Sequence, residues 1–145
     1  MTEQVFPEKI NTFIESEHVM TLSVCEEDIT WSCSLFYAWD RDNFRLIFVS
    51  ESDTKHISLM KTNNKVSGTI HNNEKRVLHI CGVQFQGIVK QTDGFYKQTA
   101  KSLFLKKFPY ARIMKLQFWV VDILYAKMTD NRQQFAQKTL WERDI

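Results

Sequence analysis

The stretch 31-WSCSLFYAW-39 alternates between two sets of side chains, which is the two-residue period of a β-strand. One set comprises Trp31, Cys33, Leu35, Tyr37 and Trp39, and the other comprises Ser32, Ser34, Phe36 and Ala38. Residues 18–25 alternate in the same way, residues 44–50 are mostly apolar, and short polar segments separate the three. Three strands joined by short turns predict an antiparallel meander.

The remainder of the chain adds helices and further strands. Apolar residues recur at helical spacing in 6–16, from Asp53 or Thr54 to about Asn63, and in 95–108, so we expect three helices. Strands are expected at 65–71, 76–91 and 115–128, followed by a short final strand or tail at 135–141. Gly82 and Gly87 suggest bulges or bends in the long segment 76–91. This pattern predicts one mainly β (α+β) domain over 1–145, a six-stranded antiparallel barrel with about three helices.

Composition excludes several functional classes. The 145 residues are 43% hydrophobic and 25% charged with a net charge of +2, which is typical of a globular domain and makes nucleic-acid binding unlikely. Three cysteines without a CxxC pair favour a reducing compartment. No apolar run approaches about 18 residues, and no signal peptide is recognised, so we expect a soluble cytoplasmic protein without a membrane segment.

Common catalytic and cofactor motifs are also missing. With four glycines, the chain contains no GxGxxG, GxxxxGK[ST] or GxSxG, and it contains no HExxH. The four histidines (His18, His56, His71 and His79) lack metal-ligand spacing, so no metal site is expected. Lys97, Lys101, Lys106 and Lys107 on the helix over 95–108 favour a solvated face, with a nucleic-acid-binding β-barrel as a secondary alternative.

The segment 52-SDTKH-56 places a cation where a helix begins. Ser52, Asp53 and Thr54 are typical helix N-caps, yet Lys55 falls in the first turn, where the helix dipole disfavours it by up to about 1 kcal/mol. A phosphate bound by Lys55 and the free N–H groups would offset this cost. Alternatively, Lys55 extends into water and the cost is screened. The local sequence leaves both interpretations open.

The order of these motifs resembles the FMN-binding split barrels related to pyridoxamine 5'-phosphate oxidase. The resemblance extends from TLSV through WSCSLFYAWD and LIFVSESDTKHISLMKTNNKVSGTI, over roughly residues 15–92. It is similar in particular to an uncharacterised bacterial branch in which SGTIH, GVQFQG and TDN recur. The resemblance implies a six-stranded antiparallel split barrel and a homodimer that holds FMN in clefts at its interface.

The resemblance also implies which residues contact the flavin. Thr54, Lys55 and His56 match the phosphate-binding helix start, with Val49 and Ser50 before it, and the charge of His56 would depend on pH. Ser32 replaces the family's arginine on the strand whose backbone, at Cys33, Ser34 and Leu35, meets the ring edge. Gln84 and, from the other chain, Trp141 or Trp119 complete the candidates.

Departures from the oxidases separate this chain from vitamin B6 oxidation. Tyr37 matches a lysine that holds the substrate phosphate in the oxidases. It is therefore a candidate substrate contact, but it lacks the positive charge of that lysine. Residues 93–112 lack the Arg-Pro stretch, and the C-terminal Arg-Leu-His motif is missing. We therefore expect an FMN-binding protein, with turnover of an unknown small molecule left open. The alternative is a non-enzymatic module for another phosphorylated or aromatic ligand, such as haem or a deazaflavin.

The segment 76–91 bears on oligomerisation. Its apolar residues fall on both faces of the expected strand: Val77, Cys81, Val83 and Phe85 on one, and Leu78, Ile80 and Ile88 on the other. A small barrel has one interior, so such a strand needs a second cover. The helix over 95–108 could provide it, as could a second copy of the chain, which the family resemblance favours.

Overall fold

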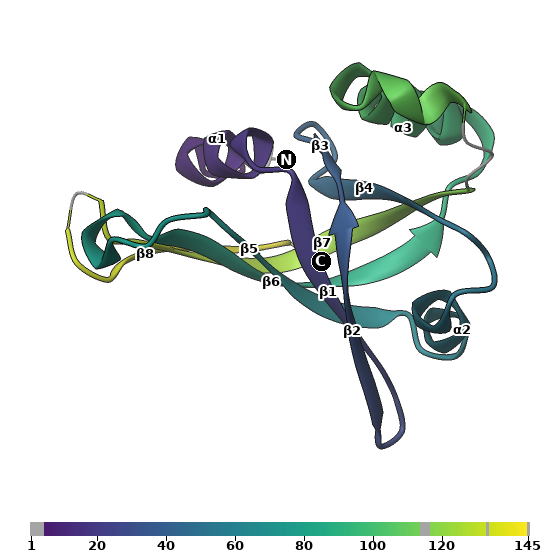
Figure 1. The fold of residues 1–145 in the computed structure, drawn as a ribbon, viewed down its shortest axis with the longest axis horizontal. Coiled ribbons are helices and arrows are strands. Elements are labelled where there is room, and N and C mark those ends of the chain that lie inside the picture. Colours follow the sequence, from purple (N-terminus) through teal and green to yellow (C-terminus); the bar gives the residue numbers. More distant parts are fainter. Residues whose placement is uncertain (1–4, 114–116, 133, 145) are drawn as a thin grey trace.

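The computed structural model describes residues 5–113, 117–132 and 134–144 (Figure 1). In chain order, the elements are α1 (Glu8–Ser16), β1 (Val19–Glu26), β2 (Ile29–Phe36), β3 (Ala38–Asp40), β4 (Arg45–Ser50), α2 (Lys55–Thr62), β5 (Lys65–His71), the 3-10 turn η1 (Val77–His79), β6 (Cys81–Gln91), α3 (Gly94–Lys107), the 3-10 turn η2 (Pro109–Ile113), β7 (Gln117–Asp130) and β8 (Gln137–Glu142). The described chain is thus mainly β with three α-helices, as the sequence predicts.

All eight strands form one antiparallel sheet in the order β2-β1-β5-β6-β7-β4-β3, with β8 added on β7. The two strands at the ends of this order, β2 and β3, are joined in the chain by the single residue Tyr37. The sheet therefore curls back on itself without closing its hydrogen-bond ladder, which is the split-barrel architecture. Eight strands replace the expected six because 31–39 is divided in two and the C-terminal segment forms a regular strand.

The division of 31–39 corrects the expected meander. Residues up to Phe36 pair with β1, whereas residues from Ala38 onward pair with β4. The period-2 pattern continues through Tyr37, which is fully buried, so the sequence shows no break there. Strand partners are chosen by tertiary packing, which alternation alone does not reveal.

The strand expected over 76–91 is shorter in the structure, where β6 spans Cys81–Gln91. Residues 77–79 form η1, where Val77 and Leu78 are exposed, and β6 begins only at Cys81. Along β6 the inward face is apolar, whereas Gln84 and Gln86 face outward and only Ile88 adds partly buried apolar surface to that side. The argument that this strand is apolar on both faces was therefore wrong. The expected bulge at Gly87 is confirmed, because the β6–β7 register shifts between Gln86 and Gly87.

Two apolar clusters stabilise the fold. The larger one fills the curl of the sheet beneath α1 and α2, and its fully buried members include Met20, Leu22, Phe48 and Ile57. The smaller one lies under α3 and joins Ile47 and Val120 to Ala100, Phe104 and Phe108. Figure 1 shows α3 over β3 and β4, while the β1–β2 hairpin extends beyond the rest of the sheet.

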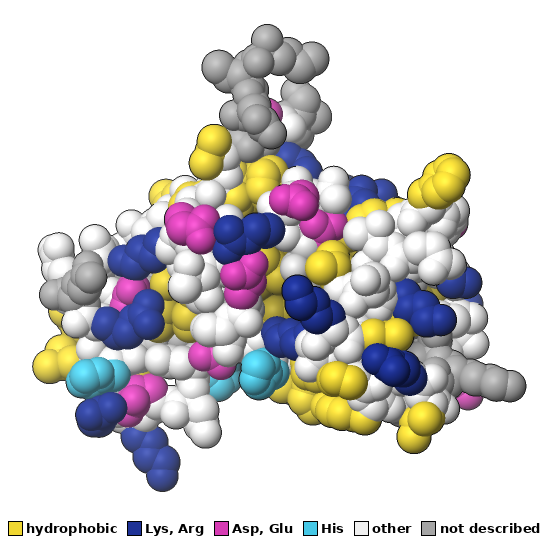
Figure 2. Space-filling model, turned by 90° about the horizontal axis from the view of Figure 1, so that it is seen from above, with side chains coloured by type: hydrophobic (Ala, Val, Ile, Leu, Met, Phe, Trp, Pro, Cys, Tyr) yellow, Lys and Arg dark blue, Asp and Glu magenta, His cyan; other side chains and the backbone are white. Residues whose placement is uncertain are grey.

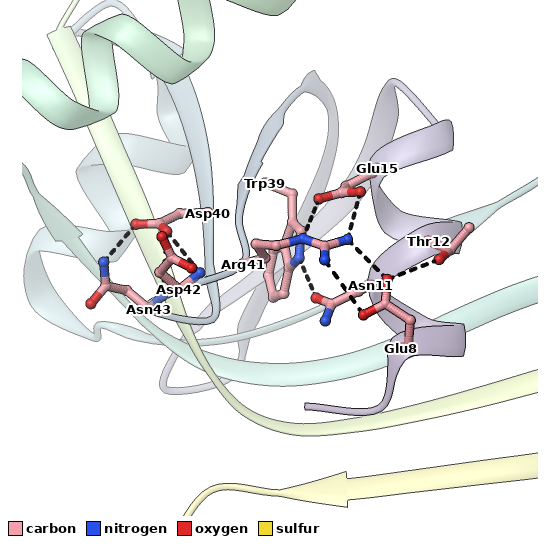
Figure 3. Close-up of polar contacts among 9 residues, drawn as sticks. All are labelled: Glu8, Asn11, Thr12, Glu15, Trp39, Asp40, Arg41, Asp42 and Asn43. Atoms are coloured by element: carbon pink, nitrogen blue, oxygen red, sulfur yellow. Dashed lines mark hydrogen bonds and ion pairs between the residues drawn. The ribbon is translucent and has the colours of Figure 1, made fainter. Parts of the chain in front are cut away.

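Polar contacts tie α1 to the β3–β4 turn (Figure 3). Arg41 pairs with Glu8 at 3.1 Å and with Glu15 at 2.7 Å, and the Trp39 indole N–H donates to the Asn11 side chain at 2.7 Å. The buried Asp40 carboxylate accepts from the backbone N–H of Asp42 at 3.1 Å and thereby stabilises the turn. These contacts hold β3 and β4 in place, and the candidate site opens beside β4.

The surface offers no continuous charged area in the view of Figure 2, where Lys and Arg side chains are scattered among acidic, neutral and hydrophobic ones. This face therefore lacks the basic footprint that the nucleic-acid alternative requires. Among the residues described, no helix combines the length and apolar character needed to cross a membrane.

Candidate functional site

A cleft opens where β2 and β4 separate. Ala38 pairs with Ile47, but one step further Phe36 pairs with Val19 of β1, while Val49 remains paired with Phe118 of β7. The two strands therefore diverge from Phe36 and Val49 onward. This divergence is the split in the barrel, and it leaves β2 as an edge strand with no strand on its other side among the described residues.

A pocket of about 360 Å³ lies at this opening. It is lined by Ser34, Leu35, Phe36, Val49, Phe104, Phe108, Tyr110 and Ala111. None of these side chains is charged, and only Ser34 and Tyr110 carry a polar group. The ring centroid of Phe108 lies 4.9 Å from that of Phe104 and 5.5 Å from that of Phe36, so the wall is built of tilted aromatic rings. Such walls suit the faces and edges of a flat apolar ring.

Lys107 holds the α3 wall against the start of β1. Its ammonium donates to the Glu17 carbonyl and lies 4.4 Å from the centre of the Tyr37 ring. Partial burial lowers its pKa to about 8. This lysine is therefore not part of a fully solvated face, in contrast to Lys97, Lys101 and Lys106, which are exposed as expected.

The start of α2 continues the site beyond the pocket. Thr54 is the N-cap, and its hydroxyl accepts from the Ile57 backbone N–H at 3.3 Å. His56 is buried, with its Nε2 2.9 Å from the Ser50 hydroxyl and 3.3 Å from that of Thr54. Burial lowers the pKa of His56, so the imidazole is neutral at neutral pH and joins the end of β4 to the start of α2. It does not act there as a second cation.

Lys55 packs on an aromatic ring rather than extending freely into water. Its ammonium lies 4.2 Å from the centre of the Trp31 ring, and Trp31 is 42% exposed on the edge strand. The structure thus brings Ser50, Thr54, Lys55 and His56 together at one end of the cleft. Leu35, Ser34 and Val49 lie at the other end, in the pocket.

Several predicted site residues lie elsewhere. Ser32 is on the opposite face of β2 from Trp31, and its hydroxyl is 2.8 Å from that of Ser23, so it does not meet Lys55. Cys33 packs partly against the core, and burial raises the pKa of its thiol. Gln84 lines a separate groove on the outer face of the sheet.

Three aromatic candidates belong to the core. Tyr37 is fully buried and its hydroxyl donates to the Ile14 carbonyl at 2.6 Å, so it offers no surface to a substrate in this chain. Trp141 is buried beside Phe6 and Phe44, with ring centroids at 4.6 Å and 5.1 Å, and is not free to contact a ring bound to another chain. Trp119 is buried as well.

Sequence reasoning missed the aromatic wall and Trp31. The sequence predicts the helix over 95–108 that carries Phe104, but nothing in the sequence places that helix over the split. Tyr110 and Ala111 carry no sequence signal for a pocket. The contact between Trp31 and Lys55 joins residues far apart in the chain, which a local pattern cannot reveal.

The curled antiparallel sheet and the pocket in its split define a split-barrel protein. A heme binding protein from Mycobacterium smegmatis has a TM-score of 0.78 at 16% identity, covering 96% of this chain and 60% of that one. An FAD-binding protein from Mesorhizobium loti has a TM-score of 0.70 at 14% identity, covering 86% and 94% of the two chains. At these identities the similarities show the fold.

Sequence similarity shows the family. No protein-family model matches the chain. A UPF0306 protein of Yersinia pseudotuberculosis serotype O:3 (strain YPIII) is 32% identical over 134 residues, which cover 92% of this chain and 91% of the Yersinia protein. The chain belongs to the UPF0306 family.

Among the residues described, no group of three or more His, Cys, Asp or Glu is arranged to hold a metal ion.

Proposed function

We propose that this chain binds FMN in the cleft between β2 and β4, as a homodimer, and that the bound flavin serves the oxidation or reduction of a small molecule. The observation that supports it most is the pairing of an uncharged, aromatic-walled pocket with a helix start that carries Lys55. The two solved structures named above, described as binding heme and FAD, are consistent with a planar ring ligand in this fold.

The donor set fits a flavin mononucleotide. The pocket offers apolar walls for the ring, while the start of α2 offers free N–H groups, the Thr54 hydroxyl and the Lys55 ammonium for a phosphate. Trp31, which marks the phosphate end, is four strand residues from Leu35 in the pocket, or about 13 Å. A ring joined to a phosphate through a sugar-alcohol chain spans such a gap along β2.

The roles of the chain's own residues follow from this placement. The unpaired edge of β2 presents backbone N–H and C=O groups beside the pocket, which can orient the polar edge of a ring. Phe36, Phe104 and Phe108 exclude water from the ring faces. The cofactor would supply the electron-transfer chemistry, and the protein would bind it and adjust its electronic environment. No described side chain in the pocket stands out as an acid or base.

The homodimer is supported by surfaces that a single chain leaves open. All but two residues of β2, Cys33 and Leu35, are exposed. The outer face of the sheet carries a groove of about 410 Å³ lined by hydroxyl and amide side chains, with Tyr125 and the buried Phe85 and no charged residue. Depletion of charge is typical of interface centres.

Purified protein titrated with FMN tests the proposal. We expect the flavin absorbance and quenched flavin fluorescence of a bound complex, followed by a test of reduction with NADH or NADPH. Lys55→Ala should weaken FMN binding by about 1.5–3 kcal/mol, the range for a hydrogen bond to a charged group. Lys61→Ala, which removes the same charge from the last turn of α2, is the control. Failure of the wild-type protein to bind FMN would overturn the proposal.

Haem is the second candidate, because the same apolar pocket would accept a porphyrin. Tyrosine ligates haem iron in some proteins, and Tyr110 is the one described lining residue of a type that can do so. Titration with hemin distinguishes the candidates: a sharp Soret band that is lost in Tyr110→Phe would favour haem, whereas flavin binding unaffected by Tyr110→Phe favours FMN.

A further inference from the structure

Trp31 is the exposed exception among four tryptophans. Trp39, Trp119 and Trp141 are each at most 6% exposed, whereas Trp31 is 42% exposed on the edge strand β2. Because its indole remains largely exposed, Trp31 contributes less hydrophobic stabilisation to the fold than a buried tryptophan does. The contact it makes is with the ammonium of Lys55, 4.2 Å from its ring centre. The contact with Lys55 therefore distinguishes Trp31 from the three buried tryptophans.

Lys55 is the one lysine or arginine of the segment 50–56. In that segment His56 is buried and its pKa is lowered, and Ser50 and Thr54 carry hydroxyls only. The carboxylates of Glu51 and Asp53 are exposed on the same turn and would repel an anion. Among the side chains of this segment, Lys55 thus provides the charge that attracts an anionic group, in addition to the free N–H groups of the helix start.

A free lysine is a flexible donor, because its four-carbon stem has many rotamers that must be restricted when it binds an anion. The Trp31 ring restricts that stem before any ligand arrives and holds the charge over the strand that leads to the pocket. An ordered donor loses less freedom on binding, so its contact with an anion is stronger.

We propose that Trp31 is a positioning residue that holds Lys55 at the helix start and thereby makes the cleft select a phosphorylated ring ligand over its unphosphorylated form. This inference rests on the proposed flavin site. It concerns one end of the ligand only: the phosphate depends on the Trp31–Lys55 pair, and the ring depends on the aromatic pocket.

Parallel titrations with FMN and riboflavin, which differ by the phosphate alone, test the pair. The wild-type protein should bind FMN more tightly, and Lys55→Met should reduce that preference to what the free N–H groups and the Thr54 hydroxyl provide. Trp31→Leu should weaken FMN binding about two- to fivefold, as expected for loss of an exposed cation–π contact, and leave riboflavin binding unchanged. In the double variant, the preference should be no lower than in Lys55→Met, because both changes remove the same contribution.

Two control variants keep the result interpretable. Trp31→Phe retains an aromatic face and should recover part of the preference, which a purely structural role for Trp31 would not predict. Lys61→Met removes an equal charge from the other end of α2 and should leave the preference intact. Thermal unfolding of each variant checks that the fold is retained.

The outcomes separate the inference from the proposed function. Equal weakening of FMN and riboflavin by Trp31→Leu, or an unchanged preference, would overturn the positioning role while leaving the flavin site in place. If the wild-type protein binds neither flavin, the proposed function fails and the inference fails with it.

Discussion

Phe36 and Ala38 are separated by one residue, yet they lie at opposite ends of the same sheet: Phe36 pairs with Val19 at one end, and Ala38 pairs with Ile47 at the other. The fully buried Tyr37 between them anchors the crossing through its hydrogen bond to the Ile14 carbonyl. Because one continuous backbone changes partners there, β2 and β4 must diverge, and the candidate cleft is the direct consequence.

Phe36→Ala should weaken flavin binding with little effect on the fold. Phe36 lines the pocket but is 55% exposed, so its removal should cost far less stability than the 3–5 kcal/mol of a buried phenylalanine. Loss of its aromatic contact should weaken FMN and riboflavin alike by about 0.5–1.5 kcal/mol. Phe95→Ala, on the same helix as the pocket wall but 98% exposed and outside the pocket, should change neither dissociation constant.

Acidification should destabilise the folded protein through His56. Burial lowers its pKa from the ordinary value of 6.5, so below that pH the unfolded chain binds a proton that the folded protein does not. The free energy of unfolding should therefore fall as the pH drops from 6.5 toward the folded-state pKa. Urea unfolding at pH about 7.5 and about 5.5 measures this fall, which should be smaller in His56→Gln. An equal fall in both proteins would contradict the role of His56.

Ser67→Arg should disrupt the proposed homodimer. Ser67 is exposed and lines the uncharged groove on the outer face of the sheet, and a two-fold contact through this groove would bring the two added cations toward each other. Sedimentation equilibrium should give a dimer for the wild-type protein and a monomer with weakened FMN binding for the variant. Thr12→Arg, at an exposed position on α1, should remain dimeric. A wild-type monomer that binds FMN at full affinity would rule out a site at the interface.

We expect no pyridoxamine 5'-phosphate oxidase activity. By the sequence resemblance, Tyr37 matches the lysine that the oxidases use for the substrate phosphate, and here it is a buried tyrosine without a positive charge. Incubation of FMN-loaded protein with pyridoxamine 5'-phosphate, with pyridoxal 5'-phosphate as the measured product, should show no turnover. A rate of about 1 per second or faster, ordinary for an enzyme, would prove this expectation wrong.

The elements of the fold could largely be predicted from local patterns. The helix starting at Lys55 and the strand Lys65–His71 follow from a capping threonine and from strict alternation, which act over a few neighbouring residues. The bulge at Gly87 was predictable because a glycine inside a strand often marks a bulge. The structure gives the reason for the glycine: a Cβ there would lie 2.5 Å from the Asp122 carbonyl oxygen. The end of β2 was not predictable, because Tyr37 continues the alternation of its strand.

The candidate site was only half predictable. Thr54, Lys55 and His56 are adjacent in the chain, so their common location follows from the sequence, although the buried, neutral state of His56 does not. Ser32, which the family resemblance also offered as a site residue, has its hydroxyl beside Ser23, whereas Lys55 lies over Trp31 on the other face of β2. Side-chain direction relative to a distant element depends on the twist and packing of the whole sheet.

By itself, the sequence determined the type and approximate limits of most helices and strands, together with the capped helix start that carries Lys55. These features depend on interactions between residues a few positions apart, which a linear pattern records. Only the tertiary structure decided that the backbone changes strand partners at Tyr37, that α3 supplies aromatic walls to the resulting gap and that Trp31 meets Lys55. Those contacts join residues dozens of positions apart, and they form only when the curled sheet is packed.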